Sequence, residues 1–256
     1  MKAMIFAAGL GTRLKPFTLE HPKALVPVCG KPMLQRVLEN IADAGVTEIV
    51  VNVHHFATQI TDFLRDNRNF GLDIKISDET DCLLDTGGGL LKARGLLLAS
   101  GSDEPILLHN ADILTDLPLG KMLANHIENG ADVTLLCSRR HSSRALYFDT
   151  SDNRLAGWEN RATGELKPQG FVPTQVTDSS PFDGIHIVSP AVFPLLEEYA
   201  DGEAKPFSIV PFYLAMLRRL DIRRYLLPEG FRWFDVGSSE KLAAAEKAIC
   251  DNTKQP

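Results

Sequence analysis

Short apolar runs alternate with amphipathic segments along the first half of the chain. The pattern predicts five strands, most of them buried, at residues 3–7, 48–53, 73–77, 105–110 and 132–137. Apolar positions spaced by three or four residues predict four helices, at residues 32–45, 57–64, 88–98 and 119–129. Strands and helices in this order are typical of βαβ units. The pattern therefore predicts an α/β fold with a mainly parallel, Rossmann-like, doubly wound sheet.

The pattern becomes irregular between residues 139 and 181. Two short runs, 145–148 and 155–158, are joined through Ser151-Asp152-Asn153 and predict a hairpin. We expect this region to form a small lid or subdomain over the sheet. The rest of the chain predicts strands at residues 182–188, 222–227 and 231–236 and helices at residues 192–199, 207–220 and 239–249. Because neither a repeat nor a linker interrupts the chain, we expect one domain over residues 1–250 and a polar tail over residues 251–256.

Composition supports a globular fold and argues against nucleic acid and membranes as partners. The chain has 256 residues, 44% of them hydrophobic, which is enough for a sizeable core. Its 27 Lys and Arg residues against 33 Asp and Glu residues give a net charge of −6. We therefore expect a surface without a broad basic face, and no nucleic-acid partner. No apolar stretch approaches the roughly 18 residues of a membrane span, so no membrane partner is expected either.

The cysteines show neither a CxxC pair nor the spacing of a zinc site. The N-terminal apolar run is too short for a secretory signal peptide. Scattered thiols without a signal peptide indicate a reducing, cytoplasmic environment, in which we expect four free thiols, at Cys29, Cys82, Cys137 and Cys250.

A glycine-rich loop, Ala8-Gly9-Leu10-Gly11-Thr12-Arg13, follows the first predicted strand directly. Glycines at this place let backbone N–H groups approach an anion closely. The loop is not a dinucleotide fingerprint, because Leu14 stands where the third glycine is needed. It is not a P-loop either, because Gly30-Lys31 is followed by Pro32. Arg13 and Lys23 add two cations, so the sequence predicts a phosphate-binding loop of a third kind.

Four segments together carry a resemblance to a known family. The stretch AAGLGTRLKPFTLEHPKALVPVCGKPML, residues 7–34, resembles the signature of the sugar-1-phosphate nucleotidyltransferases. Asp85-Thr86-Gly87-Gly88-Gly89 resembles the family's base-recognition segment. Asn110-Ala111-Asp112 and Trp233-Phe234-Asp235-Val236-Gly237-Ser238 resemble its two metal-binding elements. The resemblance extends over residues 1–249.

The resemblance implies a reaction in which a sugar 1-phosphate attacks the α-phosphorus of a nucleoside triphosphate and releases pyrophosphate. Catalysis then consists of positioning two anions and offsetting their charge. By resemblance, the catalytic cations are Arg13 and Lys23, and Mg²⁺ is held by Asp112 and Asp235. Two carboxylates are a common protein contribution to a magnesium site. The implied nucleotide-binding residues are Ala8, Gly9, Gly11, Thr12, Thr86 and Gly87.

Structural roles remain open for several of these residues. Asp112 is also suited to a turn or a helix N-cap, and Asp235 to a cap on the last helix. The Thr86–Gly89 run indicates either backbone groups that read a base or a loop that enters the next helix. Asn52 is near the end of the second strand. It can either lie beside the nucleoside or cap the end of the strand.

The sugar side departs from the family pattern. Members often carry Glu-Lys-Pro in mid-chain, and the lysine binds the sugar phosphate. The matching residues here are Trp158-Glu159-Asn160, so Asn160 stands where the lysine is expected. Arg161 and Arg139 are candidates to replace it. Gly184 resembles the glycine that lets the sugar lie close to the backbone, although a bulge would also favour glycine there.

The run Leu83-Leu84-Asp85-Thr86-Gly87-Gly88-Gly89 and the compact length are most similar to the N-acetylmuramate-1-phosphate uridylyltransferase branch, which implies UTP as the nucleotide. A muramate carries a carboxylate, so an arginine at the sugar end is expected, with Arg139, Arg144 and Arg161 as candidates. Mannose- and heptose-1-phosphate guanylyltransferases, which use GTP, share much of the pattern. A non-catalytic nucleotide-binding regulator on the same fold is the other alternative. The sequence leaves the oligomeric state open.

Overall fold

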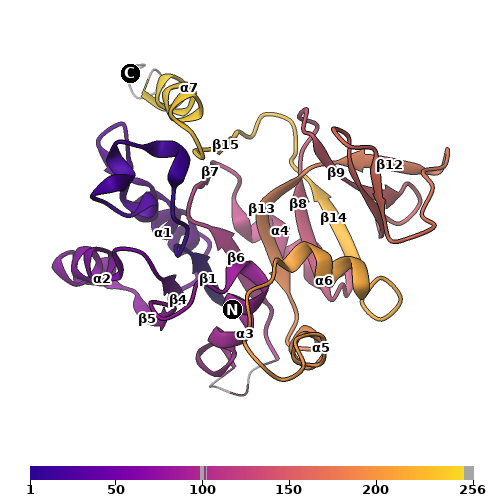
Figure 1. Cartoon of the computed structure of the whole chain (residues 1–256), viewed down its shortest axis with the longest axis horizontal. Coiled ribbons are helices and arrows are strands. Elements are labelled where there is room, and N and C mark those ends of the chain that lie inside the picture. Colours follow the sequence, from indigo (N-terminus) through magenta and orange to yellow (C-terminus); the bar gives the residue numbers. More distant parts are fainter. Residues whose placement is uncertain (99–100, 102, 251–256) are drawn as a thin grey trace.

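A seven-stranded sheet forms the centre of the computed structural model, which describes residues 1–98, 101 and 103–250. The strands are β1 (Lys2–Phe6), β4 (Glu48–Val53), β5 (Asp73–Asp78), β6 (Ile106–Asn110), β8 (Val133–Cys137), β13 (Phe182–Val188) and β14 (Ile222–Leu226). Their order is β14-β8-β13-β6-β1-β4-β5 (Figure 1). Strand β13 runs antiparallel to its neighbours β6 and β8, and the other six strands run parallel to one another. The predicted α/β class and the mainly parallel sheet are confirmed.

Helices cover both faces of this sheet, as the doubly wound prediction requires (Figure 1). One face packs against α1 (Met33–Asp43), α2 (Ala57–Asp66) and α4 (Leu119–Asn129), and α7 (Ser239–Cys250) extends the same apolar core by packing against β15 and β2. The other face packs against α3 (Asp85–Leu97), α5 (Val192–Tyr199) and α6 (Ile209–Ala215). Each face has its own apolar core, and β1 is buried between them. None of the described helices is both long and apolar enough to cross a lipid bilayer.

The irregular region forms a second, antiparallel sheet in the order β11-β10-β9-β12. Its strands are β9 (Arg144–Asp149), β10 (Leu155–Asn160), β11 (Glu165–Lys167) and β12 (Thr177–Ser180). The predicted hairpin is confirmed as β9 and β10, whereas the pattern did not reveal β11 and β12. Leu146 and Phe148 of β9 are buried in the same apolar core as α3, α5 and α6. The lid region thus packs against the main sheet through shared core residues.

Short elements connect the main sheet to the loops. The hairpin β2 (Pro27–Val28) and β3 (Lys31–Pro32) follows the glycine loop. Three 3₁₀ turns, Thr12–Leu14, Phe17–Leu19 and Lys23–Leu25, lie between the start of that loop and the hairpin. A further 3₁₀ segment, Arg68–Gly71, precedes β5. After β6, the chain forms β7 (Ile113–Thr115), which pairs with β15 (Trp233–Asp235) in a two-stranded antiparallel sheet. The sequence pattern did not predict β7.

Two helices differ from the prediction by more than two residues at one end. Helix α6 spans only Ile209–Ala215, because the chain turns after Met216, although the apolar run continues to Leu220. Helix α3 begins at Asp85, so the three glycines at 87–89 lie inside its first turns. Close packing accounts for them: a Cβ at Gly87 would lie 2.3 Å from the ring of Phe207, and one at Gly88 would lie 2.2 Å from the carbonyl oxygen of Lys205.

The prediction of four free thiols is wrong for two cysteines. Cys29 and Cys250 form a disulfide, with their Cα atoms 5.9 Å apart, and Cys82 and Cys137 are free. The bridge joins the turn between β2 and β3 to the last residue of α7. A pairing across 221 residues has no signature in sequence spacing, because it depends on how the two ends of the chain meet in the fold. The predicted polar tail, residues 251–256, lies outside the described residues.

Candidate active site

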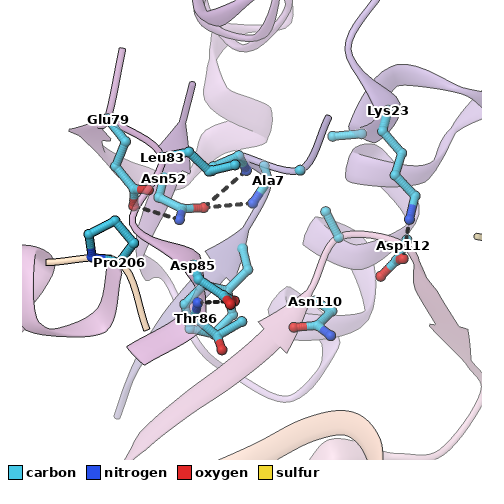
Figure 2. A pocket seen from close by; sticks show the side chains of 15 residues that line it. Ala7, Lys23, Asn52, Glu79, Leu83, Asp85, Thr86, Asn110, Asp112 and Pro206 are labelled. Atoms are coloured by element: carbon cyan, nitrogen blue, oxygen red, sulfur yellow. Dashed lines mark hydrogen bonds and ion pairs between the residues drawn. The ribbon is translucent and has the colours of Figure 1, made fainter. Parts of the chain in front are cut away.

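A cavity of about 440 Å³ lies at the carboxyl ends of β1, β4 and β6. Ligands of open α/β sheets bind at this edge, so its position is the one the topology favours. Figure 2 shows its lining, in which Lys23 and Asp112 face one another on one side and the Asp85–Thr86 turn lies on the other. Of the predicted site residues, five line the cavity: Ala8, Gly9, Lys23, Thr86 and Asp112.

The glycine loop is held against the segment that carries Lys23. Gly11 has a φ of +64°, and a Cβ there would lie 2.8 Å from the Cβ of Lys23 and 2.8 Å from the Cγ2 of Thr18. The Thr18 hydroxyl donates a hydrogen bond of 2.8 Å to the Gly11 carbonyl. Only glycine combines this backbone conformation with this close approach. Glycine at position 11 is thus required by packing within the protein, whereas Gly9 faces open space. The predicted approach of the loop to an anion stays a prediction.

Arg13 and Asp235 meet beside Gly237, although more than 220 residues separate them in sequence. A Cβ at Gly237 would lie 2.6 Å from Oδ1 of Asp235 and 3.1 Å from Nη2 of Arg13. Thr12 and Arg13 belong to the first 3₁₀ turn of the glycine loop, and Asp235 ends β15. Gly237 leaves the space that both side chains need.

Asp112 and Asp235 lie on adjacent backbone segments. In the β7–β15 pair, Asp235 stands opposite Ile113, and the N–H of Val236 donates a hydrogen bond of 2.8 Å to the Asp112 carbonyl. Each carboxylate is paired with an ammonium group: Asp112 with Lys23, and Asp235 with Lys241 of α7. The sequence analysis did not identify Lys241, which has no motif to mark it.

The donor set at this place suits Mg²⁺. The two aspartates supply hard carboxylate oxygens, and a magnesium ion usually completes its coordination with phosphates and water. Within residues 1–98, 101 and 103–250, no group of three or more His, Cys, Asp or Glu side chains is arranged to hold a metal ion by itself. A site of two carboxylates therefore leaves the other coordination positions to water or to substrate oxygens.

Asn52 connects the glycine loop to the segment that precedes α3 (Figure 2). Its Oδ1 accepts hydrogen bonds from the N–H groups of Ala7, at 2.7 Å, and Ala8, at 3.3 Å. Its Nδ2 donates to Oε1 of Glu79 at 2.8 Å, and the N–H of Leu84 donates to Oε2 of the same carboxylate at 3.1 Å. Glu79 is fully buried, and the sequence analysis missed it, because nothing in sequence marks a carboxylate one residue beyond β5 as part of a network.

The backbone N–H groups at the start of α3 form hydrogen bonds within the protein. The N–H groups of Gly87 and Gly88 donate to the carbonyl of Phe207, and the N–H of Thr86 donates to the side chain of Asp85. The Thr86 hydroxyl accepts from the N–H of Ile209 at 3.0 Å. These N–H groups already have partners, which favours the structural interpretation of this run over the reading of a base by its backbone.

Gly184 lies in a bulge near the start of β13, where the pairing with β8 shifts register. Its φ is +75°, and a Cβ there would lie 2.7 Å from Nδ2 of Asn110, a residue that lines the cavity. Gly184 is therefore a bulge residue, and its missing side chain lets the backbone lie close to Asn110. Its role toward the sugar stays a prediction.

Asn160 does not line the cavity. Its side chain forms a hydrogen bond within the turn that follows β10. Its Oδ1 accepts from the N–H of Ala162 at 3.1 Å. Among the candidate arginines, Arg161 bonds the hydroxyl of Ser179 at 2.8 Å and lies 3.4 Å from Glu159. Arg144 stands directly opposite Asn160 in the β9–β10 pair, and Arg139 lies beyond the end of β8.

Comparisons with known proteins agree with this geometry. The model of the nucleotidyl transferase family matches residues 2–252, so the chain belongs to that family. The N-acetylmuramate α-1-phosphate uridylyltransferase of Caulobacter vibrioides is 32% identical, over 97% of each chain. A mannose-1-phosphate guanylyltransferase of Arabidopsis thaliana is 28% identical over the whole of this chain, which spans 66% of that relative.

Solved structures confirm the fold. A Bacillus anthracis protein provisionally named a glucose-1-phosphate thymidylyltransferase, in complex with sucrose, superposes with a TM-score of 0.77 at 18% identity, over 98% of this chain and 96% of that one. A UDP-glucose pyrophosphorylase in complex with UDP-glucose superposes with a TM-score of 0.73 at 20% identity, over 98% of both chains. Taken with the family match, the activity is sugar-1-phosphate nucleotidyl transfer, and the substrates are a nucleoside triphosphate and a sugar 1-phosphate.

Proposed function

We propose that the chain transfers a uridylyl group from UTP to N-acetylmuramate 1-phosphate in the presence of Mg²⁺. The observation that carries this choice is the Caulobacter uridylyltransferase, which matches at 32% identity with 97% of each chain covered. The guanylyltransferase relative is less similar and is about half as long again as the matched region, since this chain spans 66% of it.

The reaction needs two anions to be brought together. An oxygen of the sugar phosphate attacks the α-phosphorus of UTP in line, the bond to the β-phosphate oxygen breaks, and pyrophosphate leaves. In this proposal the glycine loop, with Arg13, binds the triphosphate, and Lys23 neutralises charge at the α-phosphate. Asp112 and Asp235 would hold Mg²⁺, which would supply charge stabilisation at the phosphates.

We propose Arg144 as the cation of the sugar side, on its place in the β9–β10 pair. It stands across from Asn160, and directly opposed residues of an antiparallel pair project to the same face of the sheet. That face also carries the core residue Leu146, so it is turned toward the main sheet. The Arg144 side chain is exposed, and within the described residues it has no side-chain hydrogen bond or ion pair. It is therefore free to bind the phosphate or the carboxylate of a muramate.

A substrate panel tests the proposal. Purified protein with Mg²⁺ is assayed for pyrophosphate release with UTP, GTP, CTP, dTTP and ATP, each crossed with the 1-phosphates of N-acetylmuramate, N-acetylglucosamine, glucose, mannose and heptose. We expect one strong pair, UTP with N-acetylmuramate 1-phosphate. A strong pair of GTP with mannose or heptose 1-phosphate would replace the proposal by the guanylyltransferase alternative. Nucleotide binding without turnover on any pair would favour the regulator.

The Asp112→Asn variant tests the proposed metal site in the same assay. Loss of one carboxylate charge at the proposed metal site is expected to reduce pyrophosphate release by at least about 100-fold. The matched control is Asp73→Asn, an exposed aspartate of β5 at the opposite end of that strand from the cavity. Full activity in the Asp112→Asn variant would contradict the metal assignment.

A further inference from the structure

The side chain of Asp183 is fully buried at the start of β13 and bonds an arginine. Nε of Arg140 donates to its Oδ1 at 2.8 Å, and Nη2 of Arg140 donates to the carbonyl of Phe182 at 3.1 Å. Burial raises the pKa of the Asp183 carboxyl, and Arg140 opposes that rise. A buried carboxylate without its partner is strongly unfavourable, so this pair constrains the position of both chain segments.

Trp233 of β15 completes a closed set of contacts. Its Nε1 donates to the backbone carbonyl of Asp183 at 2.8 Å. The guanidinium of Arg140 lies over the Trp233 ring, 4.4 Å from the ring centroid. Each of the three residues therefore contacts the other two, and they come from three different segments: the residues after β8, the start of β13, and β15. We call Arg140, Asp183 and Trp233 the Asp183 brace.

The brace lies between two parts of the site. On one side, Gly184 follows Asp183 directly and packs against Asn110 in the cavity wall. On the other side, Asp235 is two residues beyond Trp233 on β15, and residues two apart in a strand project to the same face. The strand pairing then places Asp235 opposite Ile113, beside Asp112.

We propose that the Asp183 brace positions the sugar-binding backbone at Gly184 relative to the metal-binding carboxylate of Asp235. Its members are positioning residues: they fix the separation of the two places at which the attacking phosphate and the attacked phosphate are bound. In-line transfer depends steeply on that separation, because a misplacement of about 1 Å can reduce the rate by about 100-fold. This inference rests on the proposed roles of Gly184 and Asp235, and it does not depend on which base or sugar is used.

Three variants test the brace. Trp233→Phe keeps an aromatic ring for Arg140 and removes the donor to Asp183. Arg140→Met removes the charge and the two donated hydrogen bonds, and Arg140→Lys retains the charge. The control is Arg218→Met, an exposed arginine after α6 that is remote from the brace in the sequence and belongs to no part of the site.

Two independent readouts follow the two ends of the brace. Steady-state kinetics give KM for the sugar 1-phosphate and for the nucleotide separately. Titration of the metal alone, with Mn²⁺ followed by electron paramagnetic resonance without substrates, gives the dissociation constant at the aspartates. In Trp233→Phe and Arg140→Met we expect KM for the sugar 1-phosphate and the Mn²⁺ dissociation constant each to rise about tenfold, while KM for the nucleotide changes less than twofold. Arg140→Lys should be intermediate, and Arg218→Met should match the parent.

The outcomes decide the inference in either direction. An equal rise of both KM values, a change in only one of the two readouts, or kinetics unchanged despite a lower Tm would overturn it. If Arg140→Met fails to fold, Trp233→Phe and Arg140→Lys carry the test. The kinetic arm uses whichever substrate pair the parent protein turns over. A result other than UTP and N-acetylmuramate 1-phosphate would therefore revise the proposed substrates and leave the brace to be judged on its own.

Discussion

The side-chain amide of Asn52 donates to the carboxylate of Glu79 across 2.8 Å, and both groups are buried at the edge of the cavity. Through this bond the glycine loop and the segment before α3 share one network. Asn52→Asp places a second carboxylate against Glu79, with no cation among their hydrogen-bond partners in the described network. We expect a loss of about 3 kcal/mol in the free energy of unfolding, measured by urea denaturation.

A compensating change provides the control for that prediction. In the double variant Asn52→Asp with Glu79→Gln, the new amide donates to the new carboxylate, and the N–H groups of Ala7, Ala8 and Leu84 keep their acceptors. We expect the double variant to recover most of the lost stability and the nucleotide KM of the parent. If the two substitutions are simply additive, the network is not acting as a unit.

Gly184→Ala should impair the sugar side of the site. The backbone there has a φ of +75°, and the added Cβ would lie 2.7 Å from Nδ2 of Asn110. Gly202→Ala is the matched control, because its φ is +80° and nothing lies within 4 Å of the added atom. Both changes carry a backbone cost of about 1 kcal/mol. We expect only Gly184→Ala to lower kcat/KM for the sugar 1-phosphate, by at least about tenfold; similar values for both variants would show that the contact with Asn110 has no role.

Lys241→Met should strengthen metal binding. The Lys241 ammonium is paired with Asp235, so it competes with any cation that this carboxylate binds. The pair is partly exposed, and such pairs contribute up to about 1 kcal/mol, which corresponds to a rise in Mn²⁺ affinity of about two- to fivefold. Titration of Mn²⁺ in the absence of substrates measures it, with Lys247→Met, an exposed lysine of the same helix, as the control. Unchanged or weaker Mn²⁺ binding would mean that the ion pair does not occupy the metal site.

His186 should make the fold sensitive to acid. Its ring is buried between Phe182 and Tyr213, and burial lowers its pKa to about 3 from its ordinary value of 6.5. Between pH 6.5 and 3 the unfolded chain therefore binds a proton that the folded chain does not, and stability falls as pH falls through this window. We expect His186→Leu to reduce the slope of unfolding free energy against pH by about 1.4 kcal/mol per unit between pH 6 and 4.

The exposed His141→Leu is the control for the acid measurement. Buried His109, whose pKa burial lowers to about 4, contributes a similar slope and is unchanged in both variants. Parallel stability curves for the His186→Leu variant and the parent would contradict the prediction.

The sequence pattern alone predicted the bounds of elements whose apolar residues recur regularly or fill the whole strand. The strands at Glu48–Val53 and Phe182–Val188 and the helix at Leu119–Asn129 have the predicted bounds, because periodicity and burial agree there. The cavity lining at Ala8, Gly9, Lys23, Thr86 and Asp112 was also anticipated, because these residues belong to long, ordered motifs.

The remaining features depend on contacts between distant segments. Glu79 and Lys241 acquire their partners only when β4 approaches β5 and α7 approaches the site. Gly87 and Gly88 of α3 are explained by Phe207 and Lys205, about 120 residues away, and no local rule identifies those neighbours. Asn160 matched a motif position, but its side chain bonds within its own turn, and the arginine proposed in its place, Arg144, lies on the paired strand.

The reversed direction of β13 determines where the fold can vary. In a parallel sheet, only the loops that leave strands open onto the ligand edge. Here β8 ends at that edge and β13 begins there, so the whole segment from residue 138 to residue 181 is inserted between two neighbouring points on the rim of the site. A change in the length or shape of this insertion can therefore alter one side of the ligand edge while every strand pairing of the central sheet stays in place.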